Sequence, residues 1–112
     1  MPRSPTTLDT FSAIAEPKRR RVLDLLADGE LQVNDLVHVL GWPQPQVSKH
    51  LGVLRQVGLV HVRRDGRRQI YKLNAAQLKP VRDWVRAYER FWTQHLDRIK
   101  AAAESKAKKE NG

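Results

Sequence analysis

The sequence predicts a mainly α-helical domain with one small β-hairpin. Three observations support this fold class. Apolar residues recur at intervals of three and four along most of the chain, which is typical of amphipathic helices. Two short segments of alternating polarity flank the dipeptide Asp65-Gly66, a pattern typical of a hairpin. The 112 residues are 40% hydrophobic, which suits one domain with a modest core.

The N-terminal part is expected to form two helices after a flexible lead. Residues 1–7 are rich in Pro, Ser and Thr, and we expect them to be flexible. A short amphipathic helix begins at residue 8 and ends near Pro17. Pro17 suits the first turn of a second helix, which Gly29 ends. The basic run 19–21 is either a solvated helix face or a contact with a DNA backbone.

A helix-turn-helix pattern follows. Residues 31–40 fit a third, short helix that ends at Gly41, and residues 44–57 fit a fourth. On the fourth helix, Val47 and Leu51 begin an apolar stripe that faces the core. Two helices joined by a short glycine-containing turn are typical of DNA-binding domains.

The opposite face of the fourth helix carries amides, a hydroxyl and a cation, but no carboxylate. Gln, Ser and Lys side chains reach base edges and phosphates in a major groove. We therefore expect double-stranded DNA as the partner of this face. Gln46, Ser48 and Lys49 are expected to approach bases. The full set of contacts predicted for this helix is Gln44, Gln46, Ser48, Lys49, His50 and Arg55.

Residues 59–73 form the predicted hairpin. Asp-Gly turns join strands tightly because both turn positions favour positive φ, so Asp65-Gly66 is the predicted turn. Pairs of arginines flank it. One interpretation is an exposed hairpin kept soluble by its charge, and the other is a wing that lies along a DNA minor groove. The predicted wing contacts are Arg64, Arg67 and Arg68.

Positive charge is concentrated in this part of the chain. Lys and Arg number 21 against 12 Asp and Glu, a net charge of +9. Residues 44–73 hold seven of these cations and a single acid, Asp65, for a local charge of +6. Such a distribution favours a polyanion-binding surface over diffuse solvation.

The last predicted helix spans residues 75–104, and Asn74 and Gln77 fit a capping box at its start. Residues 105–112 are expected to be a flexible basic tail. The helix carries the richest apolar stripe of the chain, which favours packing against a second subunit; the alternative is that the helix folds back on its own domain. Its predicted interface residues are Trp84, Tyr88, Phe91, Trp92, His95 and Ile99.

Several classes of function are excluded by composition. The chain has no cysteine, so it has no disulfide, thiolate metal site or thiol redox chemistry. No nucleophile–base pair or phosphate-binding glycine loop is visible, so we expect neither an enzyme nor a cofactor. No apolar run is long enough to span a membrane, and the N-terminus lacks an apolar signal core, so we expect a cytoplasmic protein.

Three blocks of the sequence resemble the ArsR-type winged-helix repressors. They are residues 15–23, residues 44–60 (with the run Gln44-Pro45-Gln46-Val47-Ser48-Lys49-His50-Leu51) and residues 64–74. The resemblance implies a winged helix-turn-helix domain over residues 8–104. It also implies a homodimeric repressor on an imperfect palindrome, with subunits paired through the first and last helices. Leu8 and Phe11 would join the dimer interface.

The sequence departs from the family at its metal sites. Metal-sensing members carry two cysteines in a Glu-Leu-Cys-Val-Cys-Asp-Leu run, where this chain has Gln32 and Asn34. Amides are poor ligands for soft metals. Aligning the family's zinc site on Asp83 places apolar residues at the other ligand positions, so we expect no metal. Pro43 replaces the usual Ser or Thr helix cap. A cross-subunit histidine site is the alternative for metal binding.

Two further functions remain open. A small molecule could settle near Trp84, Tyr88 and Trp92 and make the regulator ligand-responsive. A winged helix can also serve only as a protein-interaction module, although such a module needs no cationic wing. Neither the effector nor the operator follows from the sequence.

Overall fold

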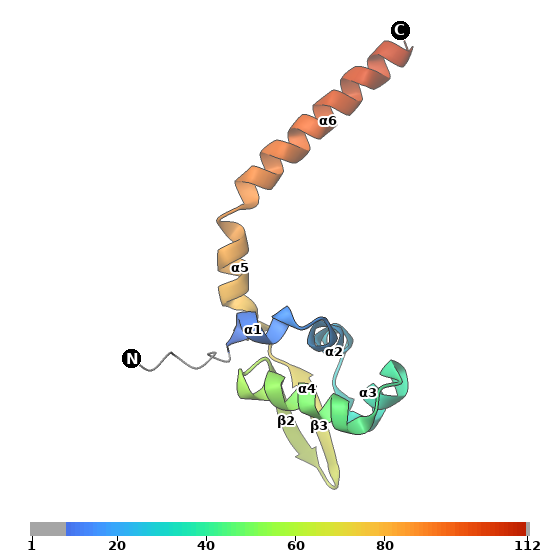
Figure 1. Ribbon diagram of the computed structural model, residues 1–112, viewed down its shortest axis with the longest axis vertical. Helices are drawn as coiled ribbons and strands as arrows, with labels where there is room; N and C mark the ends of the chain where they lie inside the picture. The colour runs from blue at the N-terminus through green and yellow to red at the C-terminus, as the bar shows by residue number, and fades with distance from the viewer. Residues whose placement is uncertain (1–8, 112) are drawn as a thin grey trace, which may run out of the picture. The chain divides into compact units, whose positions relative to one another are not determined.

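The computed structural model describes residues 9–111, with side chains for residues 9–107. The predicted flexible lead 1–7 and the predicted interface residue Leu8 lie outside this range. The fold is mainly helical with a small antiparallel sheet (Figure 1), as predicted. Its elements in order are α1 (Thr10–Ala15), α2 (Pro17–Ala27), β1 (Leu31–Gln32), α3 (Val33–Leu40), α4 (Gln44–Gln56), β2 (Val60–Asp65), β3 (Arg68–Leu73), the 3₁₀ turn η1 (Ala75–Leu78), α5 (Lys79–Arg86) and α6 (Glu89–Asn111).

The chain divides into two compact units, one ending at Pro80 and the other beginning at Val81. In the first unit, α2 packs against α4 and β3, α3 packs against α4, and α4 packs against β2. Side chains from all these elements form one core. Its fully buried members are Ala13, Val22, Leu36, Val47, Leu51, Leu54 and Leu59.

The basic run at the start of α2 has a structural role. Arg19 Nε donates to the carbonyl of Ala13 at 2.6 Å, and Arg20 Nη1 donates to the carbonyl of Ile14 at 2.6 Å. These carbonyls lie in the last turn of α1, where helical partners are missing. The two guanidinium groups therefore tie α1 to α2. This contact is an alternative to both sequence-based interpretations of the run.

The sheet has a strand that the sequence pattern did not reveal. Leu31 and Gln32 form β1, which pairs antiparallel with Tyr71 and Ile70 of β3. The sheet order is β1-β3-β2. A helix beginning at residue 31 was therefore the wrong prediction, and α3 begins at Val33. The extra pairing covers the edge of β3 that would otherwise expose unpaired backbone groups.

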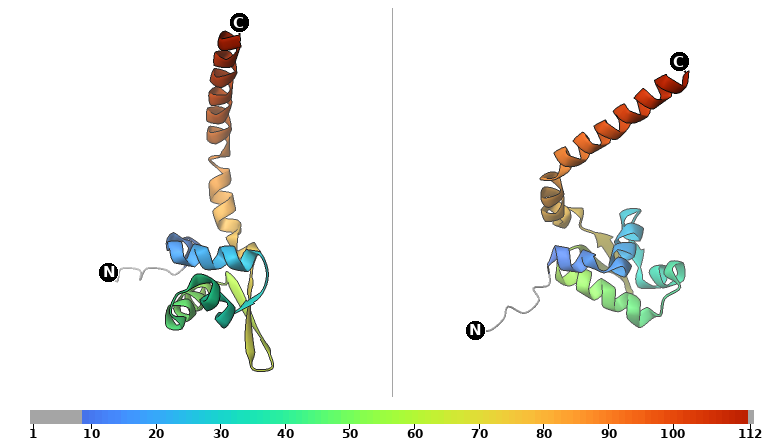
Figure 2. Two further views of the ribbon diagram at one scale, coloured as in Figure 1. Left: turned by 90° about the vertical axis from the view of Figure 1, so that its right-hand side faces the viewer. Right: turned by 45° about the horizontal axis from the view of Figure 1, so that its top comes forward.

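The hairpin turn is shifted by one residue from the prediction. Asp65 pairs with Arg68, so the two loop residues are Gly66 and Arg67. Gly66 has φ +64°, and no described non-glycine residue has positive φ. Glycine with positive φ in the first loop position is the pattern of a type II′ turn, which suits the twist of paired strands. The left view of Figure 2 shows the hairpin extending beyond the neighbouring helices, with this turn at its tip.

The C-terminal region differs from the predicted single helix over 75–104. Its first residues form η1, and Asn74 donates its side-chain amide to the carbonyl of Gly58 at 2.8 Å instead of capping. Gln77 likewise turns toward Thr10, so the predicted capping box is wrong.

A turn at Ala87 and Tyr88 separates α5 from α6. The N–H of Tyr88 donates to the carbonyl of Val85 at 2.9 Å, which tightens the backbone. The rings of Trp84 and Tyr88 pack edge to face across this turn, with centroids 5.7 Å apart. α6 then continues to Asn111, past the end predicted at residue 104, so helix replaces the predicted flexible tail. Its Ala, Lys and Glu residues all favour helix.

Candidate nucleic-acid interface

Helix α4 presents a polar face because its apolar side is fully used by the core. Val47, Leu51 and Leu54 are completely buried. This burial fixes the rotation of the helix, since side chains three and four apart share a face. The predicted contact residues on the other side are exposed, except for the half-buried Gln46. The exposed ones are Gln44, Ser48, Lys49 and Arg55.

His50 does not belong to this face. Its side chain is only 7% exposed, and its ring packs edge-on against Trp42 with centroids 6.1 Å apart. Its Nδ1 has no hydrogen-bond partner in the described structure. Burial, followed by the charge of Arg19, lowers the pKa of His50. His50 was predicted to contact DNA. That prediction is wrong, because its ring lies on the side of α4 that faces the core.

The start of α4 lacks a side-chain cap. Pro43 occupies the cap position, with φ −57° and ψ 140°, and offers no side-chain acceptor. The N–H of Gln46 bonds back to the carbonyl of Pro43 at 3.0 Å instead. A tighter first turn therefore gives this N–H a partner without a Ser or Thr cap. The positive end of this 13-residue helix dipole remains uncompensated by a nearby carboxylate side chain in its first turn.

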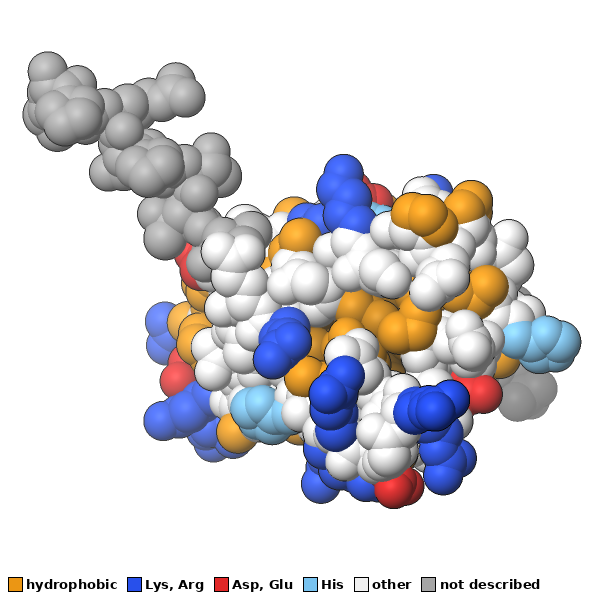
Figure 3. Space-filling model, turned by 90° about the horizontal axis from the view of Figure 1, so that it is seen from below, with side chains coloured by type: hydrophobic (Ala, Val, Ile, Leu, Met, Phe, Trp, Pro, Cys, Tyr) orange, Lys and Arg blue, Asp and Glu red, His pale blue; other side chains and the backbone are white. Residues whose placement is uncertain are grey.

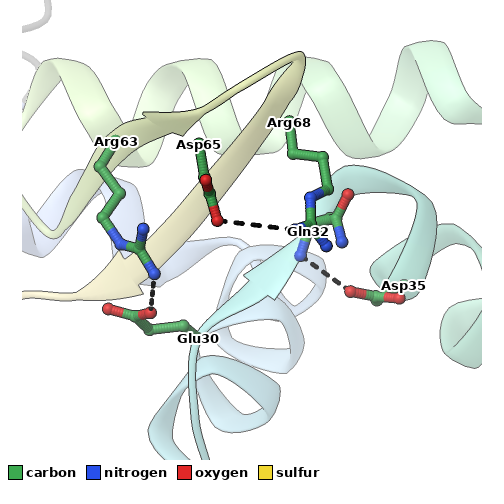
Figure 4. Close-up of polar contacts among 6 residues, drawn as sticks. All are labelled: Glu30, Gln32, Asp35, Arg63, Asp65 and Arg68. Carbon is green, nitrogen blue, oxygen red and sulfur yellow. Dashed lines mark hydrogen bonds and ion pairs between the residues drawn. The ribbon is translucent and has the colours of Figure 1, made fainter.

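The arginines of the wing, defined here as β2, β3 and their turn, differ in how they are paired. Figure 4 shows Arg63 reaching Glu30, with Nη2 and Oε2 2.8 Å apart, and Arg68 facing Asp65 at 3.5 Å. The hydrogen bond from Arg63 lowers the pKa of Glu30 and raises that of Arg63. The side chains of Arg64 and Arg67 have no ion pair or hydrogen bond within the described part of the chain.

A polar groove joins the wing to the helix-turn-helix. We call it the wing groove; its volume is about 370 Å³. It brings together four residues predicted from the sequence, and four that were missed. The lining residues are Gln32, Val33, Asn34, Gln44, Arg64, Arg67, Arg68 and Gln69. The amides Gln32, Asn34 and Gln69 were missed because no local sequence pattern marks them. They meet at the groove because the pairing of β1 with β3 brings the start of α3 beside the wing.

The charges on this side of the first unit are mainly positive. Figure 3, which views the molecule from the hairpin end, shows Lys and Arg side chains spread around an apolar patch, with acidic side chains sparse. The nearby carboxylates are engaged: Glu30 binds Arg63, and Asp35 accepts the N–H of Gln32 at 3.0 Å (Figure 4). The arrangement suits contact with a polyanion.

The second unit exposes an apolar stripe. Its large side chains are between 45% (Tyr88) and 62% (Leu96) exposed. His95 is also exposed, as is Phe11 of the first unit at 41%. A small apolar hollow of about 210 Å³ lies on the stripe, lined by Trp84, Val85, Tyr88 and Trp92. Exposed apolar surface of this kind marks an interaction site in water-soluble proteins.

Within the described residues, no group of three or more His, Cys, Asp or Glu side chains is arranged to hold a metal ion. The same residues contain no helix with the length and apolar character that crossing a bilayer requires.

The chain is similar to bacterial transcriptional regulators. Residues 16–62 match the model of the arsR family of bacterial regulatory proteins. The chain is 32% identical over 77 residues to the transcriptional repressor SdpR of Bacillus subtilis (strain 168), an overlap of 69% of this chain and 86% of that protein. It is 37% identical over 86 residues to the HTH-type transcriptional regulator Rv2034 of Mycobacterium tuberculosis, covering 77% of this chain and 78% of that one. A crystal structure described as a possible transcriptional regulator for arsenical resistance matches with a TM-score of 0.65 and 39% identity, over 85% and 96% of the two chains.

Proposed function

The chain belongs to the ArsR family of DNA-binding transcriptional regulators, and we propose that it is a homodimeric repressor that binds a two-fold operator. This family consists of regulators and not of enzymes. The observation that carries the proposal is the acid-free, exposed face of α4, with Gln44, Ser48 and Lys49 pointing away from a fully packed core. A relative of this chain, SdpR, is named a repressor.

In the proposed complex, α4 enters the major groove and the wing follows the adjacent minor groove. Lys49 and Ser48 approach base edges, and Arg64 and Arg67 contact phosphates. Two α4 helices related by a two-fold axis reach successive major grooves on one side of the duplex, about 34 Å apart. The half-sites of the operator then form an inverted repeat.

The second subunit is proposed to cover the exposed stripe of α5 and α6. Phe91, Trp92, Leu96 and Ile99 recur at helical spacing and are each at least half exposed in the single chain. Isologous packing of the same face from two copies buries this surface without any other partner. The interface also includes Tyr88 and His95 of the second unit and Phe11 of the first.

Lys49 gives the direct test of the proposed recognition. Replacing Lys49 with Ala is expected to weaken binding to the promoter DNA of its own gene by about 1–3 kcal/mol if the ammonium group contacts a base. Lys79→Ala on α5 removes the same charge from an exposed position outside α4 and serves as the control. Equal binding by the two variants in a gel shift would remove Lys49 from the interface.

A ligand-responsive function is the second candidate, because the hollow on α5 and α6 is lined by three aromatic rings and Val85. A small molecule bound there would shift the angle between the two subunits of the dimer. Quenching of tryptophan fluorescence together with loss of DNA binding supports this candidate. A dimer whose interface leaves no hollow opposes it. A purely protein-binding module is a third possibility, and promoter binding at 150 mM salt would argue against it.

A further inference from the structure

We propose that the wing groove is a phosphoryl-binding site, and that Asn34 and Gln69 are amide donors of that site. The inference rests on the proposed function, since its natural occupant is a phosphate of the bound duplex. It goes further by assigning contacts to Asn34 of α3 and Gln69 of β3, neither of which was predicted from the sequence.

The lining chemistry selects an anion. Three of the eight lining side chains are arginines, four are amides, one is Val33, and none is a carboxylate. Guanidinium and amide groups donate hydrogen bonds in the fork and paired geometries that phosphoryl oxygens accept. An apolar metabolite would find little apolar surface to contact here, because most of the lining is polar.

One groove arginine, Arg68, is paired with Asp65 at 3.5 Å, whereas the other local carboxylates lie on partners outside the groove arginines. Glu30 is held by Arg63, and Asp35 is held by the backbone of Gln32 (Figure 4). Arg64 and Arg67 are left without an acidic partner in the described structure. Both side chains line the groove, so their unpaired charges converge on one space.

The backbone at the start of α4 adds to the positive potential of the groove. Gln44, the first residue of α4, lines the groove, and this helix has neither a side-chain cap nor an acidic residue in its first turn. A helix N-terminus carries a partial positive charge that favours an anion. The dipole of α4, the wing arginines and the amides of α3 and β3 therefore act on one volume of about 370 Å³.

The test compares isosteric changes that add one negative charge. Asn34→Asp and Gln69→Glu place a carboxylate in the groove, whereas Gln94→Glu places the same charge on exposed α6. We expect each groove variant to bind promoter DNA about tenfold more weakly than Gln94→Glu, because a donor is lost and repulsion is added. If wild type binds DNA and all three variants bind equally, the groove proposal is overturned while the proposed function stands.

A second measurement identifies the source of the phosphoryl group. The side-chain amide signals of Asn34 and Gln69 are followed by NMR in the full chain, with Gln94 as the internal reference. Duplex DNA is added in one arm, and sodium pyrophosphate at ionic strength matched with chloride in the other. Shifts with DNA alone assign a backbone phosphate. Amide shifts in both arms indicate that the groove also binds a free phosphorylated ligand, which would compete with DNA. No shift in either arm contradicts the site.

Discussion

If the unpaired arginines of the wing contact phosphates as proposed, they should contribute strongly to the salt dependence of DNA binding. Arg64 and Arg67 have no acidic partner, whereas Arg63 is bound to Glu30 at 2.8 Å. The perturbation is therefore the double replacement of Arg64 and Arg67 with Ala. The matched control replaces Arg82 and Arg86 of α5 with Ala, which removes the same charge from exposed positions outside the wing.

The magnitude follows from counterion release. Each phosphate contact contributes about 0.9 to the slope of log affinity against log salt. Losing both contacts should flatten the slope by about 1.8 for each bound wing. Raising the salt from 50 to 200 mM weakens DNA binding by both proteins. The fold loss of affinity should be about twelvefold smaller, per bound wing, for the variant than for wild type.

Fluorescence anisotropy with promoter duplex at four or more salt concentrations measures this slope. Arg63→Ala is the internal comparison, because its guanidinium group is already engaged by Glu30, and we expect a smaller change from it. A slope unchanged in the Arg64 and Arg67 variant would refute the wing contact. An equal change in the Arg82 and Arg86 control would show that only net charge matters.

Two further predictions concern stability and assembly. Because burial and the charge of Arg19 lower the pKa of His50, the unfolded chain binds a proton more tightly at that position. The free energy of unfolding should therefore fall as pH drops below about 6.5. The fall should be less steep in His50→Gln. Thermal melts of both proteins across pH 4.5–7.5 check this. Identical pH profiles would show that His50 does not contribute. Trp92→Glu should convert a dimer to a monomer in light scattering after gel filtration, because it places a charge in the proposed apolar contact, while Gln94→Glu should remain dimeric. A monomeric wild-type protein would contradict the proposed interface.

The parts of the fold that periodicity controls were predictable. The stripe of Val47, Leu51 and Leu54 identified the buried side of α4, and all three are fully buried. Gly41, with φ +70°, ends α3 as its position indicated. These features depend on contacts within a few residues, so the local sequence contains the necessary information.

The parts that depend on long-range contacts were not predictable. Leu31 continues the apolar pattern of α3, yet pairing with Tyr71 draws it into a strand. Asn74 looks like a cap, but its side-chain amide donates to the carbonyl of Gly58 instead. His50 lies at the boundary of two helix faces, and in the folded chain it is buried with its ring against Trp42.

The candidate site shows the same division. Its α4 and wing residues were found from charge and spacing. The amides Asn34 and Gln69 were missed because they join the site only when β1 and the hairpin bring their elements together. Sequence spacing contains no signal for such a meeting of distant segments.

A hydroxyl-radical footprint on the promoter DNA of its own gene tests the central claim most directly. Two copies that each insert α4 into a major groove should protect two stretches on one face of the duplex, separated by about 10 base pairs and related by an inverted repeat. A single protected stretch, or protection that does not follow one face of the duplex, would contradict a dimer that reads DNA through α4.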